Sequence, residues 1–261
     1  MYNVVVIGAG MAGLTSAIYV ARAGKAVLVL ESGAIGGQIM ESLKVENWPG
    51  EVGISGPNLM NEIQQQVDNL NVKIENAEVV SVKKSDSNSF IVETDEGEYA
   101  CDSVIIATGT IPRRLSESQM REVGDRPVSY CATCDGALYK GKPVVVIGSG
   151  NTAKYEMKYL GGIASKVYHI HHDDSIPEDA AAVFVAIGRV PNTGLFEGLV
   201  NTDKDGYIVA GEDCRTSCPG VFVAGDCRTK AVRQLVTAAG DGAIAAEQAI
   251  RYLDGKDGCE Q

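Results

Sequence analysis

The sequence predicts an α/β protein of two domains, with the second domain inserted into the first. The first observation is an apolar strand pattern at residues 4–7 that runs through a glycine turn into a helical pattern at residues 12–23. The second is a repeat of this arrangement at residues 143–160, and a strand pattern follows each copy. Each copy is therefore predicted to be a βαβ unit with parallel strands. The third is that strand patterns return after residue 192. We predict one domain from residues 1–111 and 191–261, and an inserted domain at residues 112–190.

The remaining elements follow from the same patterns. Apolar residues recur on one helical face at Leu59, Ile63 and Val67, which predicts an amphipathic helix at residues 56–70. Alternating segments separated by turn residues predict antiparallel strands at residues 72–74, 78–83, 90–94 and 98–100. Further strands are expected at residues 26–30, 103–107 and 166–170, and a last helix at residues 238–253.

Composition and charge narrow the classes of function. The 261 residues are 45% hydrophobic, which is ordinary for a globular protein. The formal net charge of −11 disfavours a nucleic-acid partner, because phosphates would be repelled. No apolar run approaches the roughly 18 residues that a membrane span needs. The strand pattern at the start of the chain leaves no room for a signal peptide. Seven cysteines, an odd number with one close pair, are typical of a reducing compartment, so we expect a cytoplasmic protein.

The first glycine turn carries a nucleotide-binding pattern. Residues 8–13 read Gly-Ala-Gly-Met-Ala-Gly, a complete G-x-G-x-x-G placed between a strand and a helix. Such glycines permit a tight turn, close approach to a pyrophosphate and close packing of the helix on the strand. Glu31 ends the next strand, near the spacing at which a carboxylate accepts ribose hydroxyls. The pattern predicts a dinucleotide site on a Rossmann-like domain.

The close cysteine pair indicates redox chemistry. Cys131 and Cys134 are separated by two residues, so both thiols can lie on one turn within bonding distance, and such pairs often include a thiol of lowered pKa. A zinc half-site is the alternative, but it needs a second pair at suitable spacing. His169 and His171 point to one side of a strand without a further ligand in the sequence, so no metal is expected. The remaining thiols are interpreted as core or surface residues: Cys101, Cys214, Cys218, Cys227 and Cys259.

Further motifs resemble the FAD-binding landmarks of bacterial thioredoxin reductases of the low-molecular-weight type. They are Gly36-Gly37-Gln38, residues 45–50, residues 107–109, and the segments 219–226 and 233–240. The resemblance covers nearly the whole chain. It implies two Rossmann-like domains, FAD as cofactor and a homodimer. It also implies a set of cofactor-binding residues: Gly8, Gly10, Ala12, Gly13, Glu31, Gly36, Gly37, Gln38, Asn47, Thr108, Gly109, Gly225, Asp226, Arg233, Gln234 and Leu235.

The same resemblance implies individual roles. Asp226 would bind the ribityl chain of FAD, and Arg233 with Gln234 would lie over the flavin ring. Cys134 would be the thiol that attacks the flavin, and Cys131 the interchange thiol that attacks a protein disulfide. Asp135 would then be the acid–base group that protonates a leaving thiolate.

The inserted domain departs from the family pattern. His172 and Asp173 stand where the family carries two arginines that clasp the 2′-phosphate of NADPH, and a carboxylate there would repel that phosphate. Only residues 175–179 separate this strand from the next apolar segment, residues 180–188. By resemblance the domain is shortened by about fifty or more residues. What remains, a single βαβ unit with one further strand, cannot enclose a whole dinucleotide.

These observations predict an FAD-dependent dithiol–disulfide oxidoreductase that resembles the ferredoxin-dependent subgroup of the family. Electrons would pass from reduced ferredoxin through FAD and the dithiol to thioredoxin. Three alternatives stay open: a reductase that uses NADPH or NADH, the latter through Asp173, a dithiol oxidase that delivers electrons to oxygen, and a flavin-loaded redox sensor without turnover. Six basic residues form either a ferredoxin-docking patch or a solvated face: Arg113, Arg114, Lys140, Lys142, Lys154 and Lys158.

Overall fold

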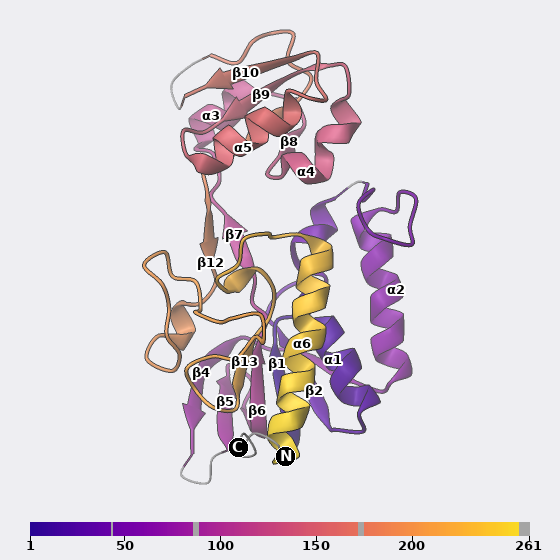
Figure 1. Ribbon diagram of the computed structural model, residues 1–261, viewed down its shortest axis with the longest axis vertical. Helices are drawn as coiled ribbons and strands as arrows, with labels where there is room; N and C mark the ends of the chain where they lie inside the picture. Colours follow the sequence, from indigo (N-terminus) through magenta and orange to yellow (C-terminus); the bar gives the residue numbers. More distant parts are fainter. Residues whose placement is uncertain (43, 86–88, 172–174, 256–261) are drawn as a thin grey trace. The chain divides into compact units, whose positions relative to one another are not determined.

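The chain forms two compact α/β units, shown in the computed structural model of Figure 1, which describes residues 1–42, 44–85, 89–171 and 175–255. The first unit comprises residues 1–43, 48–110 and 191–261, and the second comprises residues 44–47 and 111–190. The prediction of two α/β domains, one inserted into the other, is confirmed. Residues 44–47 and Ile111 group with the second unit, whereas the predicted boundaries place them in the first.

The first unit is built on a seven-stranded sheet. Its strands run in the order β3-β2-β1-β6-β5-β4, and β13 also pairs with β6. The central strands are parallel, and Val5 of β1 lies opposite Leu28 of β2 and Val104 of β6. All three are fully buried, as expected for parallel strands covered on both faces. The strands are β1 (Tyr2–Ile7), β2 (Val27–Glu31), β3 (Lys73–Asn76), β4 (Val79–Lys84), β5 (Phe90–Thr94), β6 (Glu98–Ile106) and β13 (Val221–Val223).

Three long helices belong to the first unit, and α1 packs against both others (Figure 1). They are α1 (Met11–Arg22), α2 (Gly56–Asn69) and α6 (Leu235–Leu253). Ser55 caps α2, because its side chain accepts a hydrogen bond from the Asn58 amide at 3.3 Å. Helices α1 and α6 approach closely at Gly242, where an added Cβ would lie 2.4 Å from the Ala12 carbonyl oxygen. Glycine therefore permits this packing.

Four details of the first unit differ from the sequence prediction. Residues 98–106 form one strand, β6, in place of two, because its beginning pairs with β5 while its end pairs with β1. Strand β3 pairs parallel with β2 and is not antiparallel. After residue 192 the described chain holds one named strand, β13, and two short 3-10 helices, η3 (Gly194–Phe196) and η4 (Gly225–Cys227). Helix α6 begins three residues earlier than predicted.

The second unit holds a smaller parallel sheet in the order β10-β9-β11-β8. Helix α5 packs on it through an apolar cluster that includes Ala153, Leu160 and Phe184. Its strands are β8 (Val128–Ser129), β9 (Pro143–Ile147), β10 (Lys166–Ile170) and β11 (Val183–Val185). Its helices are α3 (Glu117–Val123), α4 (Ala132–Asp135), η2 (Gly136–Tyr139) and α5 (Asn151–Leu160).

Two short strands carry the chain into and out of the inserted unit. They are β7 (Thr110–Pro112) and β12 (Arg189–Pro191), and they pair with each other as a separate two-stranded sheet. The Asn192 amide donates to the Gly109 carbonyl at 3.1 Å, and the Arg113 amide donates to the Gly188 carbonyl at 3.0 Å. In the described part of the chain, no helix is long and apolar enough to cross a membrane.

Candidate functional site

The turn at residues 8–13 is shaped by two glycines that the fold itself requires. Gly8 has φ +106°, and a Cβ there would lie 2.5 Å from the Ala107 carbonyl oxygen. A Cβ on Gly13 would lie 1.8 Å from the Gly8 carbonyl oxygen, so α1 packs on the turn only because Gly13 has no side chain. Ala12, within the same motif, is buried.

Gly10 differs, because the protein around it leaves room. It is the N-cap of α1 with φ −78° and ψ −174°, and the nearest atom to an added Cβ is the Gly36 carbonyl oxygen at 4.0 Å. The glycine is therefore not needed for packing among the described residues. The space beside it lies at a helix N-terminus, where backbone amides favour an anionic group. This arrangement fits the pyrophosphate of a dinucleotide.

Glu31 fastens the turn from the end of β2. Its Oε2 accepts a hydrogen bond from the Ala9 amide at 2.7 Å, and its Oε1 accepts one from the Gly33 amide at 2.9 Å. The Gly36 amide donates to the Ala9 carbonyl at 2.9 Å, which brings the Gly36-Gly37 motif to the same turn. Glu31 thus ends β2, as the sequence predicted, and its carboxylate holds the backbone of the turn.

Two further predicted segments lie beside the carboxyl ends of the parallel strands. Gln38, in the short helix η1 (Gly37–Glu41), donates through Nε2 to the Thr110 carbonyl. Thr108 donates through its hydroxyl to the Asn192 carbonyl at 2.6 Å. Gly109 has φ +66° and nothing within 4 Å of an added Cβ. Ligands of open α/β sheets bind at this edge. Asn47 is the exception, because it groups with the second unit.

The C-terminal motif is held by a buried ion cluster that the sequence did not predict. Asp241 of α6 accepts hydrogen bonds from Arg228 Nε at 2.9 Å and Nη2 at 2.7 Å, and from Lys230 Nζ at 2.7 Å. Its Oδ2 also accepts from the Gly225 amide at 3.0 Å, next to Asp226. Burial raises the pKa of Asp241, but the hydrogen bonds from Arg228 and Lys230 outweigh it and leave the pKa below its usual value.

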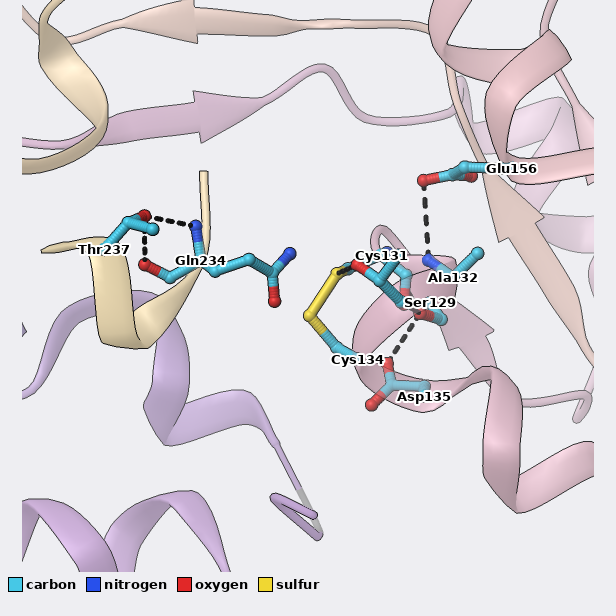
Figure 2. The surroundings of a disulfide bond; sticks show 9 residues. Ser129, Cys131, Ala132, Cys134, Asp135, Glu156, Gln234 and Thr237 are labelled. Atoms are coloured by element: carbon cyan, nitrogen blue, oxygen red, sulfur yellow. Dashed lines mark hydrogen bonds between the residues drawn. A yellow bond between two sulfur atoms is a disulfide. The ribbon is translucent and has the colours of Figure 1, made fainter. Parts of the chain in front are cut away.

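Arg233 and Gln234 follow the same segment. The Arg233 Nε donates to the Asp226 carbonyl at 3.2 Å, and its guanidinium lies 4.1 Å from the centre of the Tyr207 ring. Gln234 is the N-cap of α6, whose first residue is Leu235. Its amide donates to Thr237 Oγ1 at 3.1 Å, and that hydroxyl donates back to the Gln234 carbonyl at 3.0 Å (Figure 2). This cap explains why α6 begins before residue 238.

The predicted dithiol is a disulfide in the second unit (Figure 2). Cys131 is the N-cap of α4, and both cysteines are half-buried, with their Cα atoms 5.3 Å apart. Ser129 links the pair to Asp135. Its hydroxyl donates to Asp135 Oδ2 at 2.6 Å and accepts from the Cys131 amide at 3.1 Å. Burial raises the pKa of Asp135, against the opposing effect of the Ser129 hydrogen bond. A carboxyl group of this kind is suited to hold a proton beside a thiol.

The other described cysteines lie in surroundings that raise the pKa of their thiols. Burial raises the pKa of Cys101 and Cys214 to about 12, and that of Cys227 to about 11. Cys218 is partly exposed, and burial raises its pKa as well. Thiols of high pKa react slowly. Cys259 lies outside the described residues.

The second glycine turn, at residues 148–150 of the smaller second unit, resembles the first in geometry. Gly148 has φ +148°, and a Cβ there would lie 2.3 Å from the Ala186 carbonyl oxygen. Gly150 has nothing within 4 Å of an added Cβ. His169 Nε2 lies 2.6 Å from the Gly148 carbonyl oxygen, and the described residues include no group of three or more potential metal ligands. His172 and Asp173 lie outside the described residues.

Comparison with known proteins shows the family. A model described as pyridine nucleotide-disulphide oxidoreductase matches residues 2–179 and 174–242. The chain belongs to this family. It is 34% identical to the thioredoxin reductase of Listeria innocua, over 97% of the chain and 94% of the relative. The crystal structure of thioredoxin reductase from Streptococcus pyogenes matches with a TM-score of 0.90, at 32% identity over 98% of the chain and 99% of the relative.

A second solved structure is also similar to the chain. The crystal structure of a ferredoxin-flavin thioredoxin reductase from Clostridium acetobutylicum matches with a TM-score of 0.63, at 29% identity over 99% of each chain. Members of the family are FAD-binding flavoproteins, and the chain is a flavin disulfide oxidoreductase of the thioredoxin reductase type.

The alignments also bear on the shortened second unit. The alignment with the Listeria protein runs over 303 positions, against 261 residues in the chain. The two pieces of the family match meet at residues 174–179, the short connection that the sequence pointed out. Both findings agree with a missing segment in the inserted unit.

We expect Asp241→Asn to lower the free energy of unfolding by about 3–5 kcal/mol at pH 7, because two buried cations lose their counterion. The pKa of Asp241 is lowered in the folded protein, so its stabilising effect is present above the unfolded pKa and is lost as pH falls through the folded pKa. The difference between wild type and variant should therefore shrink in acid. Urea unfolding followed by circular dichroism across pH measures it, and Glu247→Gln on the exposed face of α6 is the matched control. A difference that stays constant in acid would contradict this account.

Proposed function

We propose that the chain reduces the disulfide of thioredoxin with electrons from reduced ferredoxin, passed through FAD and the Cys131–Cys134 pair. One observation carries the choice of donor: the dithiol turn is retained in a unit whose described sheet has four strands, within a chain of 261 residues that aligns with a relative over 303 positions. A nicotinamide dinucleotide needs a complete nucleotide-binding half to hold it. The ferredoxin-flavin thioredoxin reductase among the structural relatives supports the same choice.

The first unit is proposed to hold FAD at the carboxyl edge of its sheet. The open space beside Gly10 at the α1 N-terminus fits the pyrophosphate, and Glu31 is placed for the ribose. Asp226 is proposed for the ribityl chain, and Arg233 with Gln234 for the ring system. FAD supplies the conversion of single-electron transfers into a two-electron reduction. The remaining proposed contacts are Gly8, Ala12, Gly13, Gly36, Gly37, Gln38, Asn47, Thr108, Gly109, Gly225 and Leu235.

The second unit is proposed to carry the thiol chemistry. With the pair reduced, the Cys131 thiolate attacks one sulfur of the thioredoxin disulfide and forms a mixed disulfide. The Cys134 thiolate then attacks the Cys131 sulfur, which restores the intramolecular disulfide and releases reduced thioredoxin. Asp135 gives its proton to the leaving thiolate. The raised pKa of Asp135 keeps that proton available closer to neutral pH than an ordinary carboxyl group would.

The proposed direction of electron flow is downhill. A ferredoxin near about −400 mV and a thioredoxin near about −270 mV differ by about 130 mV, which is roughly 6 kcal/mol for two electrons. The six basic residues proposed for docking are all exposed on the second unit, and Lys154 and Lys158 are one turn apart on α5. They offer positive charge to an acidic donor on a chain whose net charge is −11. By family resemblance, we also propose a cytoplasmic homodimer.

Gly10→Val should abolish FAD binding while leaving the fold intact. The backbone angles of Gly10 suit a β-branched residue, and the new side chain would enter space that the protein leaves open. Gly150→Val is a matched control, because Gly150 caps α5 with φ −83° and ψ −174° and also has nothing within 4 Å of an added Cβ. Flavin absorbance per protein measures occupancy. Full occupancy in the folded Gly10→Val protein would refute the assigned pyrophosphate position.

The two cysteines should behave differently when replaced. Cys134→Ser keeps Cys131, so the variant should trap thioredoxin in a stable mixed disulfide but show no turnover, since the resolving thiol is gone. Cys131→Ser should trap little thioredoxin and also lose turnover. Non-reducing gel electrophoresis followed by mass spectrometry identifies the adduct. Trapping by Cys131→Ser alone would reverse the two roles.

Reduced ferredoxin should bleach the bound flavin rapidly, whereas NADPH and NADH at sub-millimolar concentration should not. Each lost charge-assisted hydrogen bond to a phosphate weakens binding by roughly 1.5–3 kcal/mol. Missing walls also remove the positioning of the nicotinamide. His172→Arg with Asp173→Arg should therefore not restore NADPH activity. Anaerobic stopped-flow absorbance decides between the donors. Fast bleaching by either nicotinamide would overturn the choice of ferredoxin.

A further inference from the structure

Helix α5 carries a carboxyl group where its spacing calls for an apolar side chain. Ala153, Glu156 and Leu160 follow one another at intervals of three and four residues, so they share one helical face. Ala153 and Leu160 belong to the apolar cluster of the second unit, and Glu156 is only 6% exposed. Glutamate is rarely buried to this extent without an ionic partner, so its position needs an explanation.

The Glu156 carboxyl group reaches the dithiol turn. Its Oε1 accepts a hydrogen bond from the Ala132 amide at 3.4 Å, and Ala132 also belongs to the apolar cluster (Figure 2). The Ala132 nitrogen is bonded to the carbonyl carbon of Cys131, so the carboxyl group lies against the backbone of the redox pair. Its Oε2 is buried, and it has no hydrogen-bond partner among the residues that the structure describes. A carboxylate with one long hydrogen bond is poorly stabilised in such surroundings.

Burial raises the pKa of Glu156 to about 7, although the Ala132 amide and the positive charge of Arg189 oppose this effect. The disulfide form of the protein therefore holds Glu156 near the midpoint of its titration at neutral pH. The titratable groups on the elements around α5 are Asp135 on α4, Tyr139 on η2, Lys166, Tyr168 and His169 on β10, and Arg189 on β12, while β9 has none. The helix itself adds Lys154, Tyr155, Lys158 and Tyr159, all exposed.

We propose that Glu156 is a positioning residue of the dithiol whose carboxylate takes up a proton when the disulfide is reduced. Two electrons break the sulfur–sulfur bond, and two protons are taken up when Glu156 is ionised in the disulfide form. One proton goes to one cysteine sulfur, the other goes to Glu156, and the second sulfur remains a thiolate. Protonation neutralises the Glu156 carboxylate, so no second negative charge lies beside the thiolate that reduction has formed on the dithiol turn. This rests on the redox activity of the pair in the proposed function, but not on the identity of the electron donor.

The proposal gives a definite pH dependence. Below about pH 7 the carboxyl group is already protonated in the disulfide form, so reduction adds no proton there. Above about pH 7 the ionised carboxylate must gain a proton on reduction, which becomes harder as pH rises. Glu156→Gln keeps an oxygen that accepts the Ala132 hydrogen bond but stays neutral at every pH. The variant should therefore resemble wild type in acid and be easier to reduce than wild type in base.

The test is the equilibrium between the pair and dithiothreitol in the full-length flavin-loaded protein, read by alkylation and mass analysis of the peptide that carries Cys131 and Cys134. The equilibrium constant for reduction of Glu156→Gln should match that of wild type within about twofold at pH 6 and exceed it about tenfold at pH 8.5. Glu122→Gln removes an exposed carboxyl group of the same unit and should equal wild type throughout. In wild type at pH 8, infrared difference spectra should show a carboxylic acid band on reduction that Glu156→Gln lacks.

The outcomes separate the two proposals. The role of Glu156 is overturned if the equilibrium constants of Glu156→Gln and wild type have the same ratio at every pH, or if Glu122→Gln shows the same pH-dependent ratio. Either result leaves the proposed function standing. If the substitution disturbs folding, the infrared band of the wild-type protein decides, and its absence overturns the role. A pair that dithiothreitol cannot reduce in any of these proteins overturns both this role and the proposed function.

Discussion

The first unit depends on the close packing of one helix, α1, against the glycine turn at residues 8–13 and against α6. Gly13 lets α1 lie against the Gly8 carbonyl, and Gly242 lets α6 lie against the Ala12 carbonyl. A side chain at either glycine would force the backbones apart. The direction of α1 fixes where its N-terminal amides point, and these amides face the space proposed for the pyrophosphate. Asp241, adjacent to Gly242, extends the same packing to the Gly225 backbone.

The sequence predicts those elements of the fold whose signals are local. Both βαβ openings, the amphipathic helix α2 and the antiparallel pair of β4 and β5 are where the patterns place them. The errors arise where a segment has two neighbours of different kinds. Strand β6 changes from an antiparallel to a parallel partner along its length, and no residue in its sequence marks the change. The start of α6 depends on Thr237 capping the helix, which periodicity does not reveal.

The candidate site divides in the same way. Glycine turns and the paired cysteines are recognisable because their chemistry requires particular residues at fixed spacing. Asp241 and Glu156 escape recognition because an acidic residue within a helical pattern is usually exposed. Their importance comes from what tertiary packing brings to them, two cations in one case and the backbone of the dithiol turn in the other. A useful signal would have been an acidic residue at a position where the helical period calls for an apolar one.

The paired strands β7 and β12 hold together the two ends of the long insertion at residues 111–190. Because the chain enters and leaves through neighbouring strands, the ends of the insertion remain adjacent whatever lies between them. Residues can be lost inside such an insertion without changing the register between β6 and β13, which belong to the sheet of the first unit. A shorter insertion is therefore compatible with keeping both the dithiol turn and the architecture of the first unit.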